Sequence, residues 1–291
     1  MDLRRLELFL AVVDEGGMTR AAKARHVSQP SVSQAIRELE AELGTPLFHR
    51  VGRGLVLTAA GDALVGPARQ ALRDVETARA AVEAVAGLTA GHLELGALPT
   101  LAVDPLATLV GRYRVAHPDV TIHLADPRDA TELAGLVGSG ECELGLTVGS
   151  GTAERAHGLE VHALSRQDLL AVLPPGTRLP GRTIGLTRLA GFALVAAPSG
   201  TATRLQFEDA FAQVGATPHV AVTAAQREAI LPLVLAGAGA TLFPRPLAEQ
   251  AAALGAVVVP VTPRLSRAVV LAHRPGPLSP AAAAFVHLAL G

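Results

Sequence analysis

The feature that most constrains this chain is a run of three closely spaced helical patterns at its N-terminus. Apolar side chains recur at helical spacing over residues 3–14, and Gly16-Gly17 stops that helix. A short helix over residues 20–25, capped by Thr19, comes next, and a turn leads into a third, longer helix. A short helix, a tight turn and a longer helix form the bihelical unit whose second helix enters the major groove of DNA.

The predicted third helix begins with a polar, uncharged segment. Ser28 is a good N-cap, Pro30 lies in the first turn, where its missing N–H costs nothing, and Gly44 ends the helix. Gln29 and Gln34 can pair bidentately with base edges, while the neighbouring hydroxyls and helix amides can bind phosphate oxygens. Any one of these residues alone is typical of ordinary polar surface. Their concentration at one exposed helix start, directly after a helix and a turn, favours DNA contact.

Two short extended runs around Gly52 and Gly54 predict a β-hairpin wing after the third helix. Arg50 and Arg53 are expected at its tip, well placed for phosphate or minor-groove contact, with simple solvation as the alternative. The predicted DNA-contacting residues are therefore Arg20, Ser28, Gln29, Pro30, Ser31, Ser33, Gln34, Arg37, Arg50 and Arg53.

A long helix capped by Thr58 and running to about Val85 is predicted next, with Pro67 as a departure from an ideal helical sequence. One narrow apolar seam runs along it, and charged residues occupy its other faces. Such a seam suits contact between two helices, while packing of the helix on its own domain is the alternative. The seam residues are Leu64, Ala68, Leu72, Val75, Ala78, Val82 and Val85.

Beyond a hinge at residues 87–91, short apolar runs alternate with helical patterns. This alternation predicts parallel sheets covered by helices, arranged as two α/β lobes that are joined by crossing strands and leave a cleft between them. The predicted strands cover residues 92–98, 120–125, 143–148, 169–173, 192–197, 219–223, 240–243, 257–261 and 268–272. The predicted helices cover residues 104–116, 130–137, 203–214 and 227–236, with a final helix from Pro280.

Hydroxyl side chains follow several of the predicted strands at their carboxyl ends, where α/β sheets bind ligands. Helix N-termini and hydroxyls together favour an anion such as a carboxylate, and Arg204 could neutralise it or point to water. Each hydroxyl alone is more typical of a helix cap, so convergence on one cleft is what favours the ligand interpretation. The predicted effector-binding residues are Thr100, Leu101, Thr147, Ser199, Thr201, Thr203 and Thr223.

Composition limits the class of protein and its partners. With 291 residues the chain has room for two or three compact units. A net charge of −1 excludes a uniformly basic protein, and 3% aromatic residues leave few platforms for stacking single-stranded nucleic acid. The lone Cys142 excludes an intramolecular disulfide and is expected to be a buried thiol. Because the first residues do not resemble a signal peptide and no long apolar run occurs, we expect a cytoplasmic protein without a membrane partner.

Residues 3–61 resemble the DNA-binding segment of the LysR-type transcriptional regulator family, element by element and at the family's spacing. Gln34 is a departure, because many members carry Arg there. The later region is similar to the family's effector-binding region, through Leu95-Gly96-x-x-Pro99-Thr100, Glu143–Leu146 and Val234–Pro244. The matching N-terminal segments are Leu6-x-x-Phe9, Ala21-Ala22, Ser28-Gln29-Pro30-Ser31-Val32-Ser33, Ile36-x-x-Leu39-Glu40, Leu43-Gly44, Pro46-Leu47-Phe48-x-Arg50 and Leu57-Thr58-x-x-Gly61.

The resemblance implies an α+β multidomain chain with a winged helix-turn-helix over residues 1–58, a dimerising linker helix over 59–87 and an effector-binding domain over 88–291. That domain is similar in fold to periplasmic solute-binding proteins, with lobe I at about 91–162 and 266–291 and lobe II at about 163–265. The implied partners are a double-stranded DNA operator, a small-molecule effector and further copies of the chain, as a dimer through the linker helix and then a tetramer. No cofactor is implied.

Two other classes of protein compete with a DNA-binding regulator. An enzyme is disfavoured because the chain has no Gly-x-Ser-x-Gly elbow and no histidine pair at metal-ligand spacing. Gly237-x-Gly239 is not a dinucleotide-binding motif either, because it lacks the third glycine and stands between a helix and a strand, which is the wrong order. We therefore expect no catalytic residues and no metal site. A solute-binding transport protein shares the lobed fold, but the helix-turn-helix and the missing signal peptide argue against it.

Overall fold

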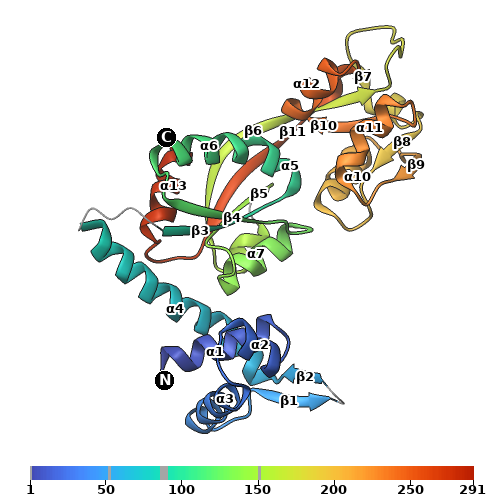
Figure 1. Ribbon diagram of the computed structural model, residues 1–291. Helices are drawn as coiled ribbons and strands as arrows, with labels where there is room; N and C mark the ends of the chain where they lie inside the picture. The colour runs from blue at the N-terminus through green and yellow to red at the C-terminus, as the bar shows by residue number, and fades with distance from the viewer. Residues whose placement is uncertain (1, 52–53, 86–90, 150–151) are drawn as a thin grey trace.

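The computed structural model describes residues 2–51, 54–85, 91–149 and 152–291. Figure 1 shows a small helical unit at the N-terminal end, one long helix leading away from it, and a larger α/β region with two lobes. Among the helices of the described residues, none combines the length and the apolar content of a membrane span.

The N-terminal unit contains three helices and a hairpin. Its core is built on Phe9, Ile36 and Leu39, each at most 1% exposed. The helix α2 begins at Met18 after the non-capping Gly17, so the prediction that Thr19 caps it is wrong. The cause is Gly17 itself, whose extended backbone lets the helix begin one residue earlier than the hydroxyl. The elements are α1 (Leu3–Asp14), α2 (Met18–Ala24), α3 (Gln29–Leu43), β1 (Phe48–Val51) and β2 (Gly54–Leu57).

The start and end of α3 are as predicted. Ser28 Oγ accepts the backbone N–H of Ser31 (3.2 Å), and Gly44 adopts the left-handed conformation with φ 70°. The hairpin is antiparallel, with Phe48 opposite Leu57. The carboxylate of Glu40 on α3 accepts the backbone N–H of Leu47 (2.8 Å) and so fixes the start of the hairpin to this helix.

The linker helix α4 (Ala59–Val85) is capped by Thr58, as predicted: the Thr58 hydroxyl accepts the backbone N–H of Gly61 (3.0 Å). The predicted seam divides into two parts. Its first half, with Leu64, Ala68 and Leu72, packs into the core of the N-terminal unit. In the second half Val75 is half-buried and Ala78 and Val82 are exposed, Val82 to 71%. The side chain of Val85 lies outside the described residues.

Lobe I contains three parallel strands in the order β4–β3–β5, with helices on both faces. They belong to a seven-stranded mixed sheet that continues from β5 through strands paired antiparallel, where the sequence predicted parallel sheets. The helices α6 and α13 cover one face around Tyr113 and Phe285, and α7 covers the other around Val137. The helix predicted from Asp104 begins later, because Asp104 is extended (φ −152°, ψ 125°). The elements are β3 (Gly91–Ala97), α5 (Pro99–Leu101), η1 (Ala102–Leu106), α6 (Ala107–Ala116), β4 (Val120–Ala125), α7 (Ala130–Ser139), β5 (Leu144–Val148), α8 (Thr152–Ala156) and α13 (Pro280–Leu290).

Two long strands connect the lobes, β6 (Glu160–Leu173) and β11 (Val257–His273). They pair antiparallel along most of their length, and β11 also pairs with β5 of lobe I. The sequence predicted only residues 169–173 of β6, and only the two ends of β11, 257–261 and 268–272, as separate strands. Their middle segments carry buried polar residues where the strands pass between the lobes, such as Gln167 and Arg267, and these interrupt the apolar pattern.

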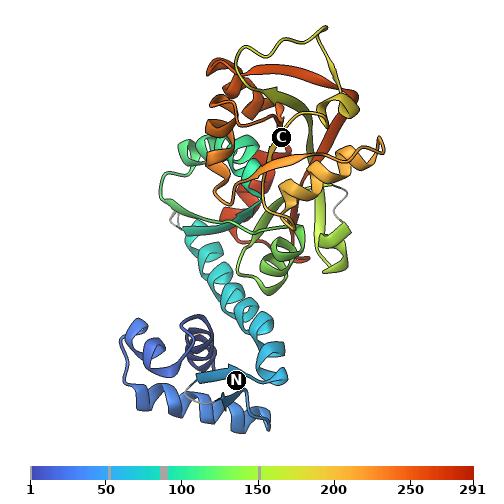
Figure 2. The ribbon, with the colours of Figure 1, turned by 90° about the vertical axis from the view of Figure 1, so that its right-hand side faces the viewer.

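Lobe II surrounds the far ends of these strands (Figure 2). Helices α9 and α10 pack on one face around Phe207 and Phe211, and α11 and α12 pack on the other around Val234 and Ala248. The elements are β7 (Ile184–Gly185), α9 (Leu186–Leu189), β8 (Leu194–Ala196), α10 (Ala202–Ala212), β9 (Val220–Thr223), η2 (Arg227–Ala229), α11 (Ile230–Leu235), β10 (Thr241–Pro244) and α12 (Arg245–Ala253).

Candidate DNA interface and effector site

The outer face of α3 presents most of the residues that the sequence predicted for DNA contact. Ser28, Gln29, Pro30, Ser31, Gln34 and Arg37 are exposed, and Ser33 is half-buried. Their side chains bond to one another along the helix. Gln29 Nε2 donates to Ser33 Oγ (2.8 Å), and Arg37 donates to Gln34 Oε1 (2.8 Å). The amides are thus held at helical spacing, available to exchange these bonds for base edges.

Arg20 lies in the first turn of α2. Its guanidinium donates to the backbone carbonyls of Glu15 and of Gly16, the latter at 2.7 Å. These are orphan carbonyls at the end of α1, so Arg20 serves as a C-terminal cap there. Of the two predicted wing arginines, Arg50 lies on β1 opposite Leu55. The Arg50 side chain and all of Arg53 lie outside the described residues.

The sequence analysis did not single out the basic start of α1. Arg4 and Arg5 line an open hollow of about 560 Å³, together with Pro30, Gln34 and Arg37 of α3. Arg5 is held there by ion pairs with Glu38 (3.2 Å) and Glu42 (3.1 Å), which are also on α3. The adjacent pair Arg4-Arg5 was the available signal.

A buried arginine on a crossing strand joins the two lobes. The side chain of Arg267 on β11 is 8% exposed overall and donates to Gln167 Oε1 on β6 at 2.8 Å and 3.0 Å. It also donates to Thr100 Oγ1 at the start of α5 (2.8 Å) and to Gln206 Oε1 on α10 (2.8 Å). Burial lowers the pKa of Arg267 to about 10, and the nearby Asp104 carboxylate opposes that shift. The guanidinium therefore stays charged at neutral pH.

Gln167 links this arginine to an acid. Its amide nitrogen donates to the Asp104 carboxylate (2.8 Å) and to the Asp104 carbonyl (2.9 Å), while its oxygen accepts from Arg267. In the described chain the acceptors of Arg267 itself are neutral oxygens, so its charge meets a carboxylate only through Gln167. This is a site where an anion can add a charge-assisted hydrogen bond.

Sequence reasoning missed Arg267 because it began the last strand at Ala268. The signal was the alternation of Leu265, Arg267, Val269 and Leu271, which places a charged residue in the inward register of a strand. Gln167 and Gln206 carry no comparable signal.

The other predicted effector residues are dispersed, and Thr100 is the one that bonds to Arg267. Leu101 is fully buried in the lobe I core, which leaves its side chain no route to a ligand. Thr147 on β5 is fully buried, and its hydroxyl has no hydrogen-bond partner within the described parts of the chain. Thr201 caps α10 by accepting the N–H of Arg204 (3.3 Å). Thr203 is half-buried in the first turn of α10, and Ser199 and Thr223 are exposed.

Two further contacts hold the lobes together near α10. Arg227 of lobe II forms an ion pair with Asp126 of lobe I (3.1 Å). The backbone N–H of Ala202 at the start of α10 donates to the carbonyl of Arg128 (3.2 Å). Arg204 forms an ion pair with Glu208 (2.7 Å) on its own helix.

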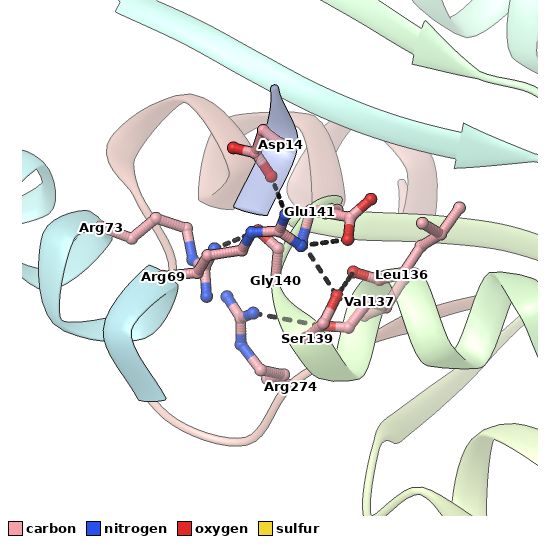
Figure 3. Close-up of polar contacts among 9 residues, drawn as sticks. All are labelled: Asp14, Arg69, Arg73, Leu136, Val137, Ser139, Gly140, Glu141 and Arg274. Carbon is pink, nitrogen blue, oxygen red and sulfur yellow. Dashed lines mark hydrogen bonds and ion pairs between the residues drawn. The ribbon is translucent and has the colours of Figure 1, made fainter. Parts of the chain in front are cut away.

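The N-terminal unit, the linker helix and lobe I meet at Arg69 (Figure 3). Arg69 on α4 forms ion pairs with Asp14 at the end of α1 and with Glu141 after α7. Both acids are half-exposed, so these pairs contribute little to stability. What they define is the relative position of three parts of the chain.

Two more arginines bind the carboxyl end of α7 beside Arg69 (Figure 3). Arg73 donates to the Gly140 carbonyl, and Arg274 Nη1 donates to the Val137 carbonyl (3.1 Å). The negative end of a helix dipole favours cations at this position. Burial, and then the charge of Arg274, lower the pKa of Arg73 to about 10.

A three-helix unit with a wing, attached through a long helix to a two-lobed α/β domain, defines a DNA-binding regulator with a ligand-sensing domain. Comparison with known families agrees. Residues 3–62 match the family model "Bacterial regulatory helix-turn-helix protein, lysR family", and residues 86–291 match the family model "LysR substrate binding domain". The chain belongs to the LysR family of transcriptional regulators.

Individual relatives extend over most of the chain. The nitrogen assimilation regulatory protein nac of Klebsiella aerogenes is 30% identical, over 100% of this chain and 94% of its own. The HTH-type transcriptional regulator YdcI of Escherichia coli strain K12 is 33% identical, over 72% of this chain and 68% of its own. Full-length CbnR, crystallised with its target DNA, superposes with a TM-score of 0.67 at 25% identity and 99% coverage of both chains.

Proposed function

We propose that this regulator reads its operator with the outer face of α3 and responds to an anionic effector that binds between the lobes at Arg267. The observation that carries the effector proposal is the buried guanidinium, whose direct acceptors among the described residues are the neutral oxygens of Gln167, Gln206 and Thr100. A carboxylate is the ligand that a guanidinium fork fits best.

For DNA, the proposed base contacts come from Gln29 and Gln34, which are exposed on the first turns of α3. The serines beside them, the N-terminal amides of α3 and the wing arginines Arg50 and Arg53 contact phosphates in this proposal. Arg4 joins them because it lies beside α3. The relative CbnR has been crystallised with its target DNA, which supports the same role for this chain.

The proposed coupling between ligand and DNA begins at Gln206. An effector carboxylate that replaces Gln206 Oε1 at Arg267 releases α10 of lobe II from β11. The loss of this bond weakens the contact between the lobes, which the Arg227–Asp126 ion pair and the Ala202–Arg128 hydrogen bond still join, and so shifts their relative angle. In this proposal α7 of lobe I transmits the movement to α4 through Arg73 and Arg69. The effector shifts this equilibrium only by its difference in affinity for the two arrangements.

The proposed assembly is a dimer through the exposed second half of α4 and a tetramer through the sensor domains. The outward-facing Ala78 and Val82 support the dimer, since the first half of the seam is occupied by the chain's own N-terminal unit. Two recognition helices then read an interrupted inverted repeat. We retain the proposed domain limits 1–58, 59–87 and 88–291, and a cytoplasmic location, where bacterial DNA is accessible.

DNase footprints on the DNA upstream of the gene that encodes this protein test the proposal. The purified protein should protect an interrupted inverted repeat. One member of a panel of carboxylic acids, amino acids and sugar acids should change the length or spacing of that protection. A footprint that neutral analogues change while every anion leaves it constant would contradict the anionic effector. Absence of any selective protection would contradict the DNA-reading role.

A further inference from the structure

A cluster of two histidines and a glutamate lies on lobe I, away from the inter-lobe site. Glu160 and His162 alternate on β6 and so share one face of the sheet, and His273 on β11 stands directly opposite Glu160. Within the described residues, Glu160, His162 and His273 form the one group of three or more such side chains whose ligand atoms all lie within 4.8 Å of one another. The two histidines are 111 residues apart in sequence, so no local spacing reveals them.

The donor atoms lie close to one another. His162 Nε2 and His273 Nε2 are 2.9 Å apart, and His273 Nε2 is 3.8 Å from Glu160 Oε2. The imidazole rings are nearly parallel, at 15°. A tetrahedral Zn²⁺ ion with bonds of about 2.0–2.1 Å places its ligand atoms roughly 3.3 Å from one another. The observed separations lie on either side of that distance, so small side-chain adjustments suffice.

The tautomer of His273 is set by its other nitrogen. His273 Nδ1 is 2.7 Å from the backbone carbonyl of Arg274, which can only accept a hydrogen bond. Nδ1 therefore carries the proton, and in the neutral ring Nε2 offers a lone pair toward His162 and Glu160. A histidine whose second nitrogen donates to a carbonyl is the usual arrangement of a metal ligand.

Burial is graded across the cluster. His273 is 6% exposed, His162 is half-buried and Glu160 is exposed. Two imidazoles and one carboxylate with one side open to solvent suit a divalent transition-metal ion that retains a water molecule.

We propose that Glu160, His162 and His273 bind one divalent transition-metal ion of the Zn²⁺ class. The ion links β6 to β11 at their lobe I ends, where the two strands lie side by side (Figure 1). His273 is six residues from Arg267 along β11, about 20 Å in an extended strand, so the ion does not belong to the proposed effector site.

The test is titration of metal-free, tag-free full-length protein with Zn²⁺ by calorimetry, and with Co²⁺ by visible absorption. The wild type should bind one ion per chain, with Co²⁺ giving the intense visible bands of a tetrahedral site. His162→Gln and Glu160→Gln should each weaken binding at least about tenfold, the lower limit for loss of even an outer-shell partner. Neither readout requires DNA or effector.

A matched control is available on the same sheet. His123 forms an ion pair with Glu94 (3.0 Å) but belongs to no three-ligand group in the described chain. His123→Gln should bind Zn²⁺ like the wild type. Because His273 is buried, His273→Gln is informative only if its circular dichroism spectrum matches that of the wild type. The test therefore depends on the variants of His162 and Glu160, which are more exposed. Absence of stoichiometric binding, or equal binding by His162→Gln and the wild type, would overturn the proposal and leave a hydrogen-bonded histidine pair.

Discussion

Arg267 donates a hydrogen bond to Thr100 Oγ1 (2.8 Å), which joins a crossing strand to the first helix of lobe I. Through Gln206 the same guanidinium reaches lobe II. This one side chain is therefore placed to sense both a ligand and the relative position of the lobes.

Replacing Arg267 should remove the response to effector while DNA binding persists. Charge-assisted hydrogen bonds contribute about 1.5–3 kcal/mol each. Arg267→Met should therefore lower the affinity for the carboxylate effector about 10-fold to 100-fold, as measured by calorimetry. Arg166→Met is the control, because Arg166 on β6 is exposed and bonds to Ser266. Equal effector affinity in Arg267→Met and the wild type would refute the proposed site.

Two glycines near the end of α7 should respond oppositely to alanine. Gly140 has φ 76°, and an added Cβ would overlap the guanidinium groups of Arg73 and Arg274. Gly140→Ala should therefore lower the free energy of unfolding by about 1–2 kcal/mol. Gly138 lies in the helix with open space around its Cα, and Gly138→Ala should raise that free energy by about 0.5–1 kcal/mol.

Urea unfolding measures the free energy of unfolding of both glycine variants. If the junction at Arg73 transmits the signal, Gly140→Ala should also reduce the footprint change caused by effector, and Gly138→Ala should leave that change intact. The same loss in both variants would argue against transmission through this junction.

Dimerisation should depend on the exposed half of α4. Val82 is 71% exposed, and Val82→Glu should weaken the proposed dimer because it places like charges opposite each other at the helix pair. Val115 on α6 is 86% exposed, so Val115→Glu controls for the added charge. Sedimentation velocity across a concentration series should show dissociation in the first variant only. An unchanged assembly in Val82→Glu would place the interface elsewhere.

The thiol of Cys142 should be inert in the native protein. Burial, and then the carboxylates of Glu94 and Glu141, raise its pKa from 9.0 to about 12. The native state therefore keeps the thiol proton up to about pH 12, while the unfolded chain releases it near pH 9. It follows that this group's contribution to stability is complete below pH 9 and is lost as pH rises from 9 to 12.

Two measurements check this account of the thiol. A thiol reagent at neutral pH should label Cys142 only after unfolding. The free energy of unfolding of the wild type should also fall more steeply between pH 9 and pH 10 than that of Cys142→Ala. Comparing the two proteins removes the contribution of the other titrating groups, which both share. Fast labelling of the folded protein, or equal slopes, would contradict the burial argument.

The N-terminal unit could be predicted because its information is local. The Ser28 cap, the Pro30 position and the Gly44 stop of α3 are each determined by neighbours in sequence. The inter-lobe network could not be predicted in this way, because Arg267 meets residues 61 to 167 positions away. For the same reason the sequence analysis found no histidine pair at metal-ligand spacing: His162 and His273 are 111 residues apart in sequence.

The crossing strands show a second limit. Residues 163–168 and 262–267 are mainly polar and were predicted to lie outside strands, yet they continue β6 and, apart from a break in register, β11. Periodicity detects a strand only where one face meets an apolar core. The split of the linker seam has a similar origin, since Leu72 and Val82 look equivalent in sequence and differ only in what packs against them.

The measurement that tests the central claim most directly is binding of the protein to its own upstream DNA across a series of salt concentrations, with Arg50→Ala and Gln29→Ala alongside. The account predicts tight, sequence-selective binding that weakens with salt. Arg50→Ala should weaken binding to all sequences and lower the salt slope by about one, while Gln29→Ala should weaken mainly the true site, by about 1–3 kcal/mol. Binding without sequence preference at every salt concentration would contradict it, and so would a Gln29→Ala variant that prefers the specific site over random DNA as strongly as the wild type does.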